Sequence, residues 1–205
     1  MNTYLGAAQL LSAAEIAEDE IAAAKVTYLE GYLWDPQNAK DAFVKAARIA
    51  HQAKRIVALT LSDPFCVDRY RDEFRALVKN GTIDLLFANE SELKSLYQTA
   101  DFDSAVAALR NEARLAVVTR SEKGALVVAC EKTEAVDAFP VDKVVDTTGA
   151  GDLFAAGFLH GFARGLPHTT SARLGALAAA EVISHLGARP EQKLADLARE
   201  KKLPT

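Results

Sequence analysis

The sequence predicts a three-layer α/β fold, in which helices cover both faces of a mostly parallel sheet. Short apolar segments typical of buried strands alternate with longer segments that carry apolar residues at helical spacing. Turn and capping residues separate most of these segments. The 205 residues show no internal repeat and no low-complexity linker, so we expect one domain over residues 1–205.

Local signals predict each element of the first half of the chain. Ser12 and Glu15 form a capping box, which predicts a helix that runs to about Ala24. Asp35-Pro36 offers an N-cap and a first-turn proline to the next helix. The expected strands are Thr3–Gly6, Val26–Trp34, Ile56–Leu61 and Ile83–Ala88, and the later helices are Phe65–Lys79, Glu90–Tyr97 and Asp103–Glu112.

The second half begins with strands and ends with helices. A turn around Lys123-Gly124 joins two strongly apolar strands, and two helices rich in small residues follow. The expected strands are Leu115–Thr119, Ala125–Cys130 and Ala135–Phe139, and the expected helices are Ala150–Arg164, Thr169–His185 and Glu191–Lys201.

Composition excludes several classes of protein. The net charge of -4 gives no basic surface for nucleic acid, and no apolar run is long enough for a membrane span. Cys66 and Cys130 lie far apart without metal-ligand spacing, so a disulfide framework is not expected. A reducing, cytoplasmic setting fits this pattern best.

The strongest motif is Val-Asp-Thr-Thr-Gly-Ala-Gly-Asp at 145–152, which leads directly into a predicted helix. Two glycines at a helix start let the backbone approach a ligand closely, and the unpaired N–H groups of the first turn favour an anion. The motif lacks the lysine of a P-loop. It also differs from the dinucleotide-binding pattern, because Phe154 occupies the position of the third glycine.

Asp152 has two interpretations from its position alone. A carboxylate beside a bound phosphate suits a base that takes a proton from an attacking hydroxyl. The same carboxylate in the first turn of a helix would also stabilise the helix dipole. Spacing leaves these alternatives about even.

The segment Asp-Thr-Thr-Gly-Ala-Gly-Asp, followed by Phe-Ala-Ala-Gly-Phe, resembles the C-terminal signature of the ribokinase/PfkB carbohydrate kinases. The resemblance implies a Rossmann-like, ribokinase-type sheet and ATP-dependent phosphoryl transfer. It assigns the anion hole to the backbone of Gly149, Ala150 and Gly151, and the catalytic base to Asp152.

Two further segments resemble family motifs in the same order. Asn89 and Glu92 match an N-x-x-E motif that organises Mg²⁺ and phosphate through water, although a plain helix start explains them as well. Thr119, Arg120 and Gly124 lie in a segment that resembles the strand and turn beside the ATP phosphates and ribose. The usual pattern has a glycine where Ser121 stands, and Arg120 is equally well explained as a surface charge.

Asp146 and Thr148 match positions that help to hold a monovalent cation, such as K⁺, in many relatives. Asp146 would equally serve the geometry of the loop. The helix Ala172–His185 and the turn after it resemble the adenine-flanking segment of the family, although its many alanines also suit helix packing.

The acceptor is predicted from three segments that resemble the adenosine-kinase branch. Leu61-Ser62-Asp63-Pro64-Phe65 is the most informative, and 84–92 and 28–32 agree with it. Phe65 after a strand could stack on a purine, or it could belong to the core. Adenosine or a related nucleoside is the expected acceptor, and a sugar such as fructose, ribose or a keto-deoxy acid is the alternative.

Relatives of this kind begin with further strands, a small β-sheet lid and a Gly-Gly segment, and these do not precede Met1. We therefore expect the chain to be a C-terminal portion with an open sheet edge, able to form a homodimer, and a chain that is inactive on its own remains an alternative. The apolar side chains expected to be exposed there are Tyr4, Leu5, Tyr32, Trp34 and Phe65.

Overall fold

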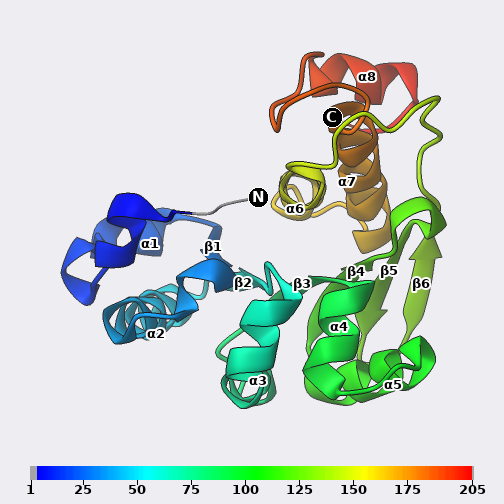
Figure 1. The fold of residues 1–205 in the computed structure, drawn as a ribbon. Coiled ribbons are helices and arrows are strands. Elements are labelled where there is room, and N and C mark those ends of the chain that lie inside the picture. Colours follow the sequence, from blue (N-terminus) through cyan, green and yellow to red (C-terminus); the bar gives the residue numbers. More distant parts are fainter. Residues whose placement is uncertain (1–3, 205) are drawn as a thin grey trace. The chain divides into compact units, whose positions relative to one another are not determined.

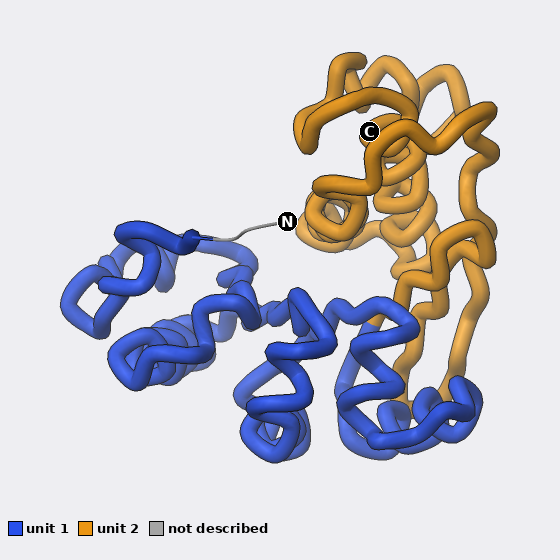
Figure 2. Tube along the Cα trace, viewed as in Figure 1, with its two compact units in different colours: residues 1–116 blue, residues 117–205 orange. Residues whose placement is uncertain are grey.

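The computed structural model describes residues 4–204, and the chain divides into two compact units, residues 1–116 and 117–205 (Figure 2). Each unit buries apolar side chains of its own. A single domain over residues 1–205 stays a prediction.

The strands form a six-stranded sheet in the order β1-β2-β3-β4-β5-β6 (Figure 1). β1 pairs with β2, and β2 with β3, in parallel, whereas β5 and β6 form an antiparallel pair. The strand bounds are β1 Val26–Glu30, β2 Ile56–Thr60, β3 Leu85–Asn89, β4 Leu115–Thr119, β5 Ala125–Ala129 and β6 Thr133–Val136.

The helices of the first unit alternate with its strands, as expected for parallel β-α units. Trp34 lies at the centre of their packing, in contact with the rings of Phe43 and Phe74, and its indole N–H donates to Glu73 at 2.8 Å. The α-helices are α1 Glu18–Ala23, α2 Gln37–Gln52, α3 Pro64–Lys79, α4 Glu90–Tyr97 and α5 Phe102–Glu112.

The expected strand Thr3–Gly6 is wrong where the structure describes it. Tyr4 and Leu5 are not in a strand, and a short 3-10 helix runs over Gly6–Leu10, while Thr3 lies outside the described residues.

The expected helix from Ser12 to Ala24 is interrupted. The Ser12–Glu15 capping box is present, but it begins only a 3-10 turn, Ala13–Glu15. Helix α1 starts afresh at Glu18, where three consecutive acidic residues occupy its first turn and interact favourably with the helix dipole.

The predicted strand Val26–Trp34 and the predicted start of the next helix at Asp35-Pro36 both need correction. β1 ends at Glu30, because Gly31 packs so closely on the Leu61 carbonyl that an added Cβ would lie 2.7 Å from it, and the chain turns there into the 3-10 helix Gly31–Trp34. Helix α2 then begins at Gln37 without a side-chain cap. Asp35 instead pairs with Arg69 at 3.2 Å.

Most, but not all, of the apolar side chains that were expected to be exposed are exposed in the structure. Tyr4, Tyr32 and Phe65 are exposed, and Leu5 is half-buried. Trp34 is 4% exposed, because the ring contacts described above enclose it.

The helices of the second unit pack closely through small residues. A Cβ added at Gly157 would lie 2.6 Å from the carbonyl oxygen of Leu174, and one added at Gly175 would lie 2.5 Å from that of Phe154. The glycines thus allow backbone contact between α6 and α7. The bounds are α6 Ala150–Phe162, α7 His168–Val182 and α8 Leu194–Glu200.

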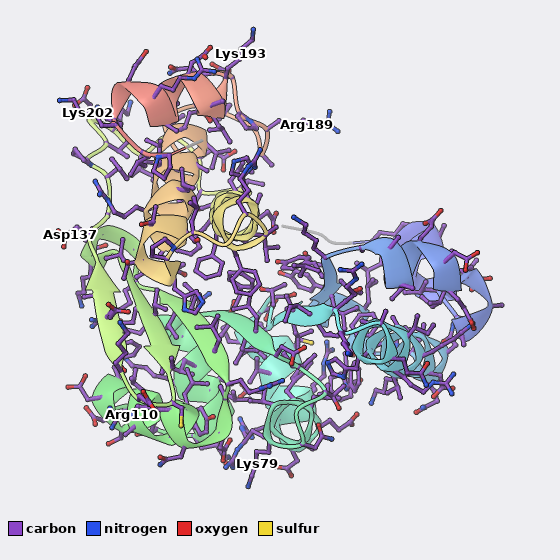
Figure 3. All side chains as sticks on the ribbon, turned by 180° about the vertical axis from the view of Figure 1, so that it is seen from behind. Lys79, Arg110, Asp137, Arg189, Lys193 and Lys202 are labelled. Carbon is purple, nitrogen blue, oxygen red and sulfur yellow. The ribbon has the colours of Figure 1, made fainter. Side chains whose placement is uncertain are left out.

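Helix α8 packs on α7 through Ala198 and the following Leu203, which are buried with Leu174 and Leu177. Lys193 and Lys202, just outside its two ends, point away from this contact (Figure 3). Among the described residues, no helix has the length and apolar character needed to cross a bilayer.

Two predicted elements of this unit are displaced. β6 ends at Val136 rather than Phe139, because its pairing with β5 ends where Val136 lies opposite Ala125. The last helix begins at Leu194 rather than Glu191, because the backbone N–H groups of residues 191 and 192 donate to a side chain of α7.

Candidate active site

The predicted site residues fall into two sets, one in each unit. Unit 117–205 contains the glycine-rich motif and the turn after β4, and unit 1–116 contains the residues at the ends of β2 and β3.

Gly149 is the N-cap of α6 and adopts a left-handed conformation, with φ +80° and ψ 0°. Its carbonyl accepts the first helical hydrogen bond, from Leu153 N–H at 2.9 Å. Glycine reaches this conformation without steric cost, so the loop can turn sharply into the helix. The first-turn amides of α6 therefore point outward from a helix start, the arrangement that favours an anion.

The two glycines of the motif have different surroundings. A Cβ added at Gly149 would lie 2.8 Å from the Cβ of Ala188, whereas one added at Gly151 would meet nothing within 4 Å. Gly149 is thus required by the protein's own packing. Gly151 leaves open space beside the helix start, which is the space that a bound phosphate would need.

Asp152 lies exposed in the first turn of α6. Its position is compatible with a base that faces a bound acceptor and with a residue that stabilises the helix dipole. Its catalytic role therefore stays a prediction.

Asp146 organises the loop that precedes α6. One carboxylate oxygen accepts both the N–H and the hydroxyl of Thr148, at 2.9 and 2.7 Å, and the other accepts Gly187 N–H at 3.1 Å. These hydrogen bonds, those from Thr148 foremost, hold the pKa of Asp146 below its usual range. The loop-geometry interpretation therefore has a structural basis, and the cation role stays a prediction.

The turn after β4 requires the glycine that the sequence places there. Gly124 has φ +78°, and an added Cβ would lie 2.0 Å from the carbonyl oxygen of Val136. Arg120 N–H donates to Gly124 carbonyl at 2.7 Å and closes the turn. Ser121 has φ +53°, a conformation that favours glycine. This conformation is consistent with the glycine that the family motif usually has at this position.

A cavity of about 170 Å³ brings several predicted residues of this unit together. Thr119 and Gly124 line it from the turn, and Ala150 and Gly151 line it from the start of α6. The rest of its wall is apolar and formed largely by small side chains: Ala138, Phe139, Phe154, Ala176, Ala179, Ala180 and Ile183. A mostly apolar slot that ends at a helix N-terminus suits a flat ring joined to a phosphate. Arg120 and Asp152 are not among the lining residues.

In the other unit, Asn89 and Glu92 form a capping box at the start of α4. The Asn89 side chain accepts Glu92 N–H at 2.8 Å, and Glu92 accepts both Asn89 N–H at 2.9 Å and the Asn89 amide at 2.7 Å. Burial raises the pKa of the Glu92 carboxyl to about 7, although the bond from Asn89 N–H opposes this rise. Glu92 is 5% exposed, so it is buried rather than solvated, and its link to Mg²⁺ stays a prediction.

The described residues contain no group of three or more His, Cys, Asp or Glu side chains that could hold a metal ion. Magnesium commonly keeps several waters and binds through one or two carboxylates and the substrate phosphates. A single acid such as Glu92 fits that mode of binding. Magnesium bound in this way does not need a cage of several protein carboxylates.

Phe65 lies in the first turn of α3 and is 78% exposed, so the core interpretation of this ring is wrong. Its backbone N–H donates to Asp63, the N-cap of α3, at 2.6 Å. Phe65 follows β2 and Asn89 ends β3, and these strands are parallel neighbours. Both residues thus lie at the carboxyl edge of the sheet, where open α/β sheets bind their ligands.

Some residues of the site had no local signal in the sequence. Phe139 and Phe154 line the cavity, yet as single aromatic residues they read as ordinary core. Glu181 was also missed, because an isolated acid in an alanine-rich helix resembles a solvent-facing residue. It is 6% exposed and accepts the backbone N–H groups of residues 191 and 192.

Residues 1–194 match the pfkB family carbohydrate kinases. The chain belongs to this family. The chain is similar to a probable sugar kinase from Rhizobium etli CFN 42, at 48% identity and a TM-score of 0.97. The match covers 100% of this chain and 62% of that one. It is also similar to an adenosine kinase from Sinorhizobium meliloti, at 51% identity and a TM-score of 0.96, over 98% of this chain and 62% of that one.

Two more distant matches agree with this result. The adenosine kinase of Saccharomyces cerevisiae is 29% identical over 207 residues, which cover 94% of this chain and 60% of that protein. A structure titled "putative Ribokinase II" from E. coli, in complex with ATP and Mg²⁺, shares the fold at 20% identity and a TM-score of 0.83, over 94% of this chain and 63% of that one. These matches confirm the predicted three-layer, ribokinase-type fold. The chain spans about 60% of the length of these relatives.

Proposed function

We propose that the chain carries the ATP site of a kinase that transfers the γ-phosphoryl group of ATP to a hydroxyl of a nucleoside, with adenosine as the acceptor. The observation that carries this proposal is the cavity shared by the start of α6 and the turn after β4. It joins an apolar slot of adenine-like chemistry to the backbone of a helix N-terminus.

In the proposed reaction Asp152 takes the proton of the acceptor hydroxyl. The acceptor oxygen forms a bond to the γ-phosphorus, the bond to the β,γ-bridging oxygen breaks, and ADP leaves with that electron pair. The backbone N–H groups of Gly149, Ala150 and Gly151, aided by the dipole of α6, stabilise the charge on the transferred group. Thr119, Arg120 and Gly124 would contact the nucleotide from the turn.

Mg²⁺ would neutralise charge on the ATP phosphates, and the E. coli relative was solved with both ATP and Mg²⁺. We assign Glu92 and Asn89 to its water shell. Asp146 and Thr148 are the proposed oxygen ligands of a monovalent cation such as K⁺. For Asp146 this role would add to the loop contacts that it already makes.

The choice of adenosine depends on Phe65. An exposed ring at the carboxyl edge of the sheet can stack on a purine base. The 51% identical relative named an adenosine kinase supports this choice, while the 48% identical relative named a probable sugar kinase favours a sugar as the second candidate.

An acceptor panel tests the proposal. The purified chain is incubated with ATP and Mg²⁺ and with adenosine, cytidine, ribose or fructose in turn, and ADP formation and the phosphorylated product are measured. We expect the highest kcat/KM with adenosine, and Phe65→Ala should lower it more for adenosine than for ribose. A higher kcat/KM with a sugar would mean that the acceptor is a sugar and not adenosine. Absence of both ATP binding and phosphoryl transfer would overturn the proposed function.

A further inference from the structure

The segment between α7 and α8 contacts the start of α6. Gly187 N–H donates to the Asp146 carboxylate at 3.1 Å. Ala188 packs against Gly149 so closely that a Cβ on the glycine would lie 2.8 Å from the Cβ of Ala188. The segment 186–192 thus packs against the turn at Gly149 and is hydrogen-bonded to Asp146 before it. A shift of the segment would disturb that turn.

A buried acid holds the far end of this segment. Glu181, on the last turn of α7, is 6% exposed, and its Oε1 accepts the backbone N–H groups of Glu191 at 2.8 Å and Gln192 at 2.9 Å. One carboxyl oxygen can accept two hydrogen bonds through its two lone pairs. One side chain of a rigid helix therefore fixes two consecutive backbone groups of a connecting segment.

His185 supports the same contact. Its Nε2 lies 3.3 Å from Glu181 Oε1, and its Nδ1 lies 3.8 Å from Glu191 Oε1. The hydrogen bond to the Leu186 carbonyl, together with these two acids, raises the pKa of His185. Burying a polar group is costly unless it is hydrogen-bonded, and the bonds from residues 191 and 192 offset that cost at Oε1, whereas Oε2 has no hydrogen-bond partner among the described residues.

We infer that Glu181 is a positioning residue of the phosphate site: it fixes the 186–192 segment, and that segment holds Gly149 in the conformation that starts α6. The inference rests on the proposed function for its effect on ATP, but the positioning itself depends only on contacts within residues 117–205. Glu181 does not line the cavity and therefore acts through the segment.

Two substitutions separate the charge from the hydrogen bonds. Glu181→Gln keeps an oxygen that can accept the two N–H groups, whereas Glu181→Ala leaves both without an acceptor. The control is Glu112→Gln, which neutralises another mostly buried acid that accepts hydrogen bonds from Arg75 and Tyr97 in the other unit. A purely structural effect of losing a buried acid would be common to all of these variants.

The first measurement is amide hydrogen exchange without nucleotide. We expect exchange at residues 187, 191 and 192, and at 150 and 153, whose N–H groups donate to the carbonyls of Thr147 and Gly149, to accelerate by about tenfold or more in Glu181→Ala and by less in Glu181→Gln, with no change there in Glu112→Gln. Acceleration confined to residues 191 and 192, or none at all, would overturn the inference, whether or not the chain binds ATP.

The second measurement is ATP affinity and transfer rate. We expect Glu181→Ala to weaken ATP binding about tenfold and to lower kcat, with KM for the acceptor unchanged, and Glu181→Gln to restore part of the loss. Normal ATP binding and kcat in a variant with accelerated exchange at residues 150 and 153 would refute the positioning role. If the unaltered chain binds no ATP, the proposed function fails, while the exchange result still decides the role of Glu181.

Discussion

At the scale of single residues, the proposed function asks most of Asp152, its proposed base, because only a group that touches the acceptor hydroxyl can remove its proton. Asp152→Asn keeps the size of the side chain and removes the base. We expect kcat to fall by about two to four orders of magnitude, with ATP affinity nearly unchanged.

The alternative role of Asp152, stabilising the dipole of α6, predicts a different result. The asparagine variant would then lose up to about 1 kcal/mol of stability and retain turnover within a few-fold of the original. Steady-state kinetics and urea unfolding of the same preparation separate the two roles.

Glu92 gives a pH dependence of stability that can be measured without any ligand. Burial raises the pKa of its carboxyl to about 7, from an ordinary value of 4.5. The folded chain therefore holds a proton that the unfolded chain releases, so this group's contribution to stability is present below pH 4.5 and is lost as the pH rises to about 7. The difference corresponds to at most about 3 kcal/mol.

Glu92→Gln removes this titration but keeps an oxygen that can accept Asn89 N–H. We expect the free energy of unfolding of the variant to decline less than that of the original chain between pH 5 and pH 8, without nucleotide or Mg²⁺. Parallel pH profiles for the two proteins would show that Glu92 titrates at its ordinary value in the folded chain.

At the scale of elements, the start of α6 offers a matched pair of substitutions. Gly149→Ala forces a left-handed residue that costs about 1–2 kcal/mol, and its Cβ would also meet Ala188. Gly151→Ala enters open space and improves helix propensity, so stability should hold or rise slightly.

For Gly151→Ala, activity should fall although stability does not. The methyl group at residue 151 would occupy the space proposed for the phosphate, so we expect Gly151→Ala to weaken ATP binding and slow transfer in a fully stable protein. Thermal unfolding and kcat/KM for ATP measure both effects. Full activity of a stable Gly151→Ala variant would place the phosphate elsewhere.

Elements with strong local signals were predicted closely. The bounds of α4 and β4 agree with the structure, because Asn89 caps the helix and Leu115–Val118 is a continuous buried run. Predictions failed where distant contacts set the boundary. Gly31 ends β1 against the carbonyl of Leu61, and Glu181 binds the N–H groups that would have started a helix at Glu191.

The same distinction applies to the candidate site. The glycine-rich motif was recognisable because its chemistry lies in consecutive residues and its turn needs glycine. The contact between Ala188 and Gly149, and the two N–H groups held by Glu181, join residues that are ten or more positions apart. No periodicity or capping rule reports such contacts, so only the structure reveals them.

At the scale of the whole molecule, β1 lies at one end of the strand order, so one of its edges has no neighbouring strand within the described sheet. Apolar side chains are exposed in the same unit: Tyr32, directly after β1, is 44% exposed, Leu10 is 74% exposed and Phe65 is 78% exposed. An open strand edge together with exposed apolar side chains favours pairing with a second chain. We therefore predict a concentration-dependent homodimer.

Sedimentation velocity over a wide range of protein concentration tests this prediction. A lysine at position 32 would place a charge beside the end of β1, so Tyr32→Lys should shift the equilibrium toward monomer. Val44→Lys is the control, because Val44 is 52% exposed on helix α2 rather than next to the strand edge. A chain that stays monomeric at every concentration would refute the prediction, and equal effects of the two lysines would locate the contact away from β1.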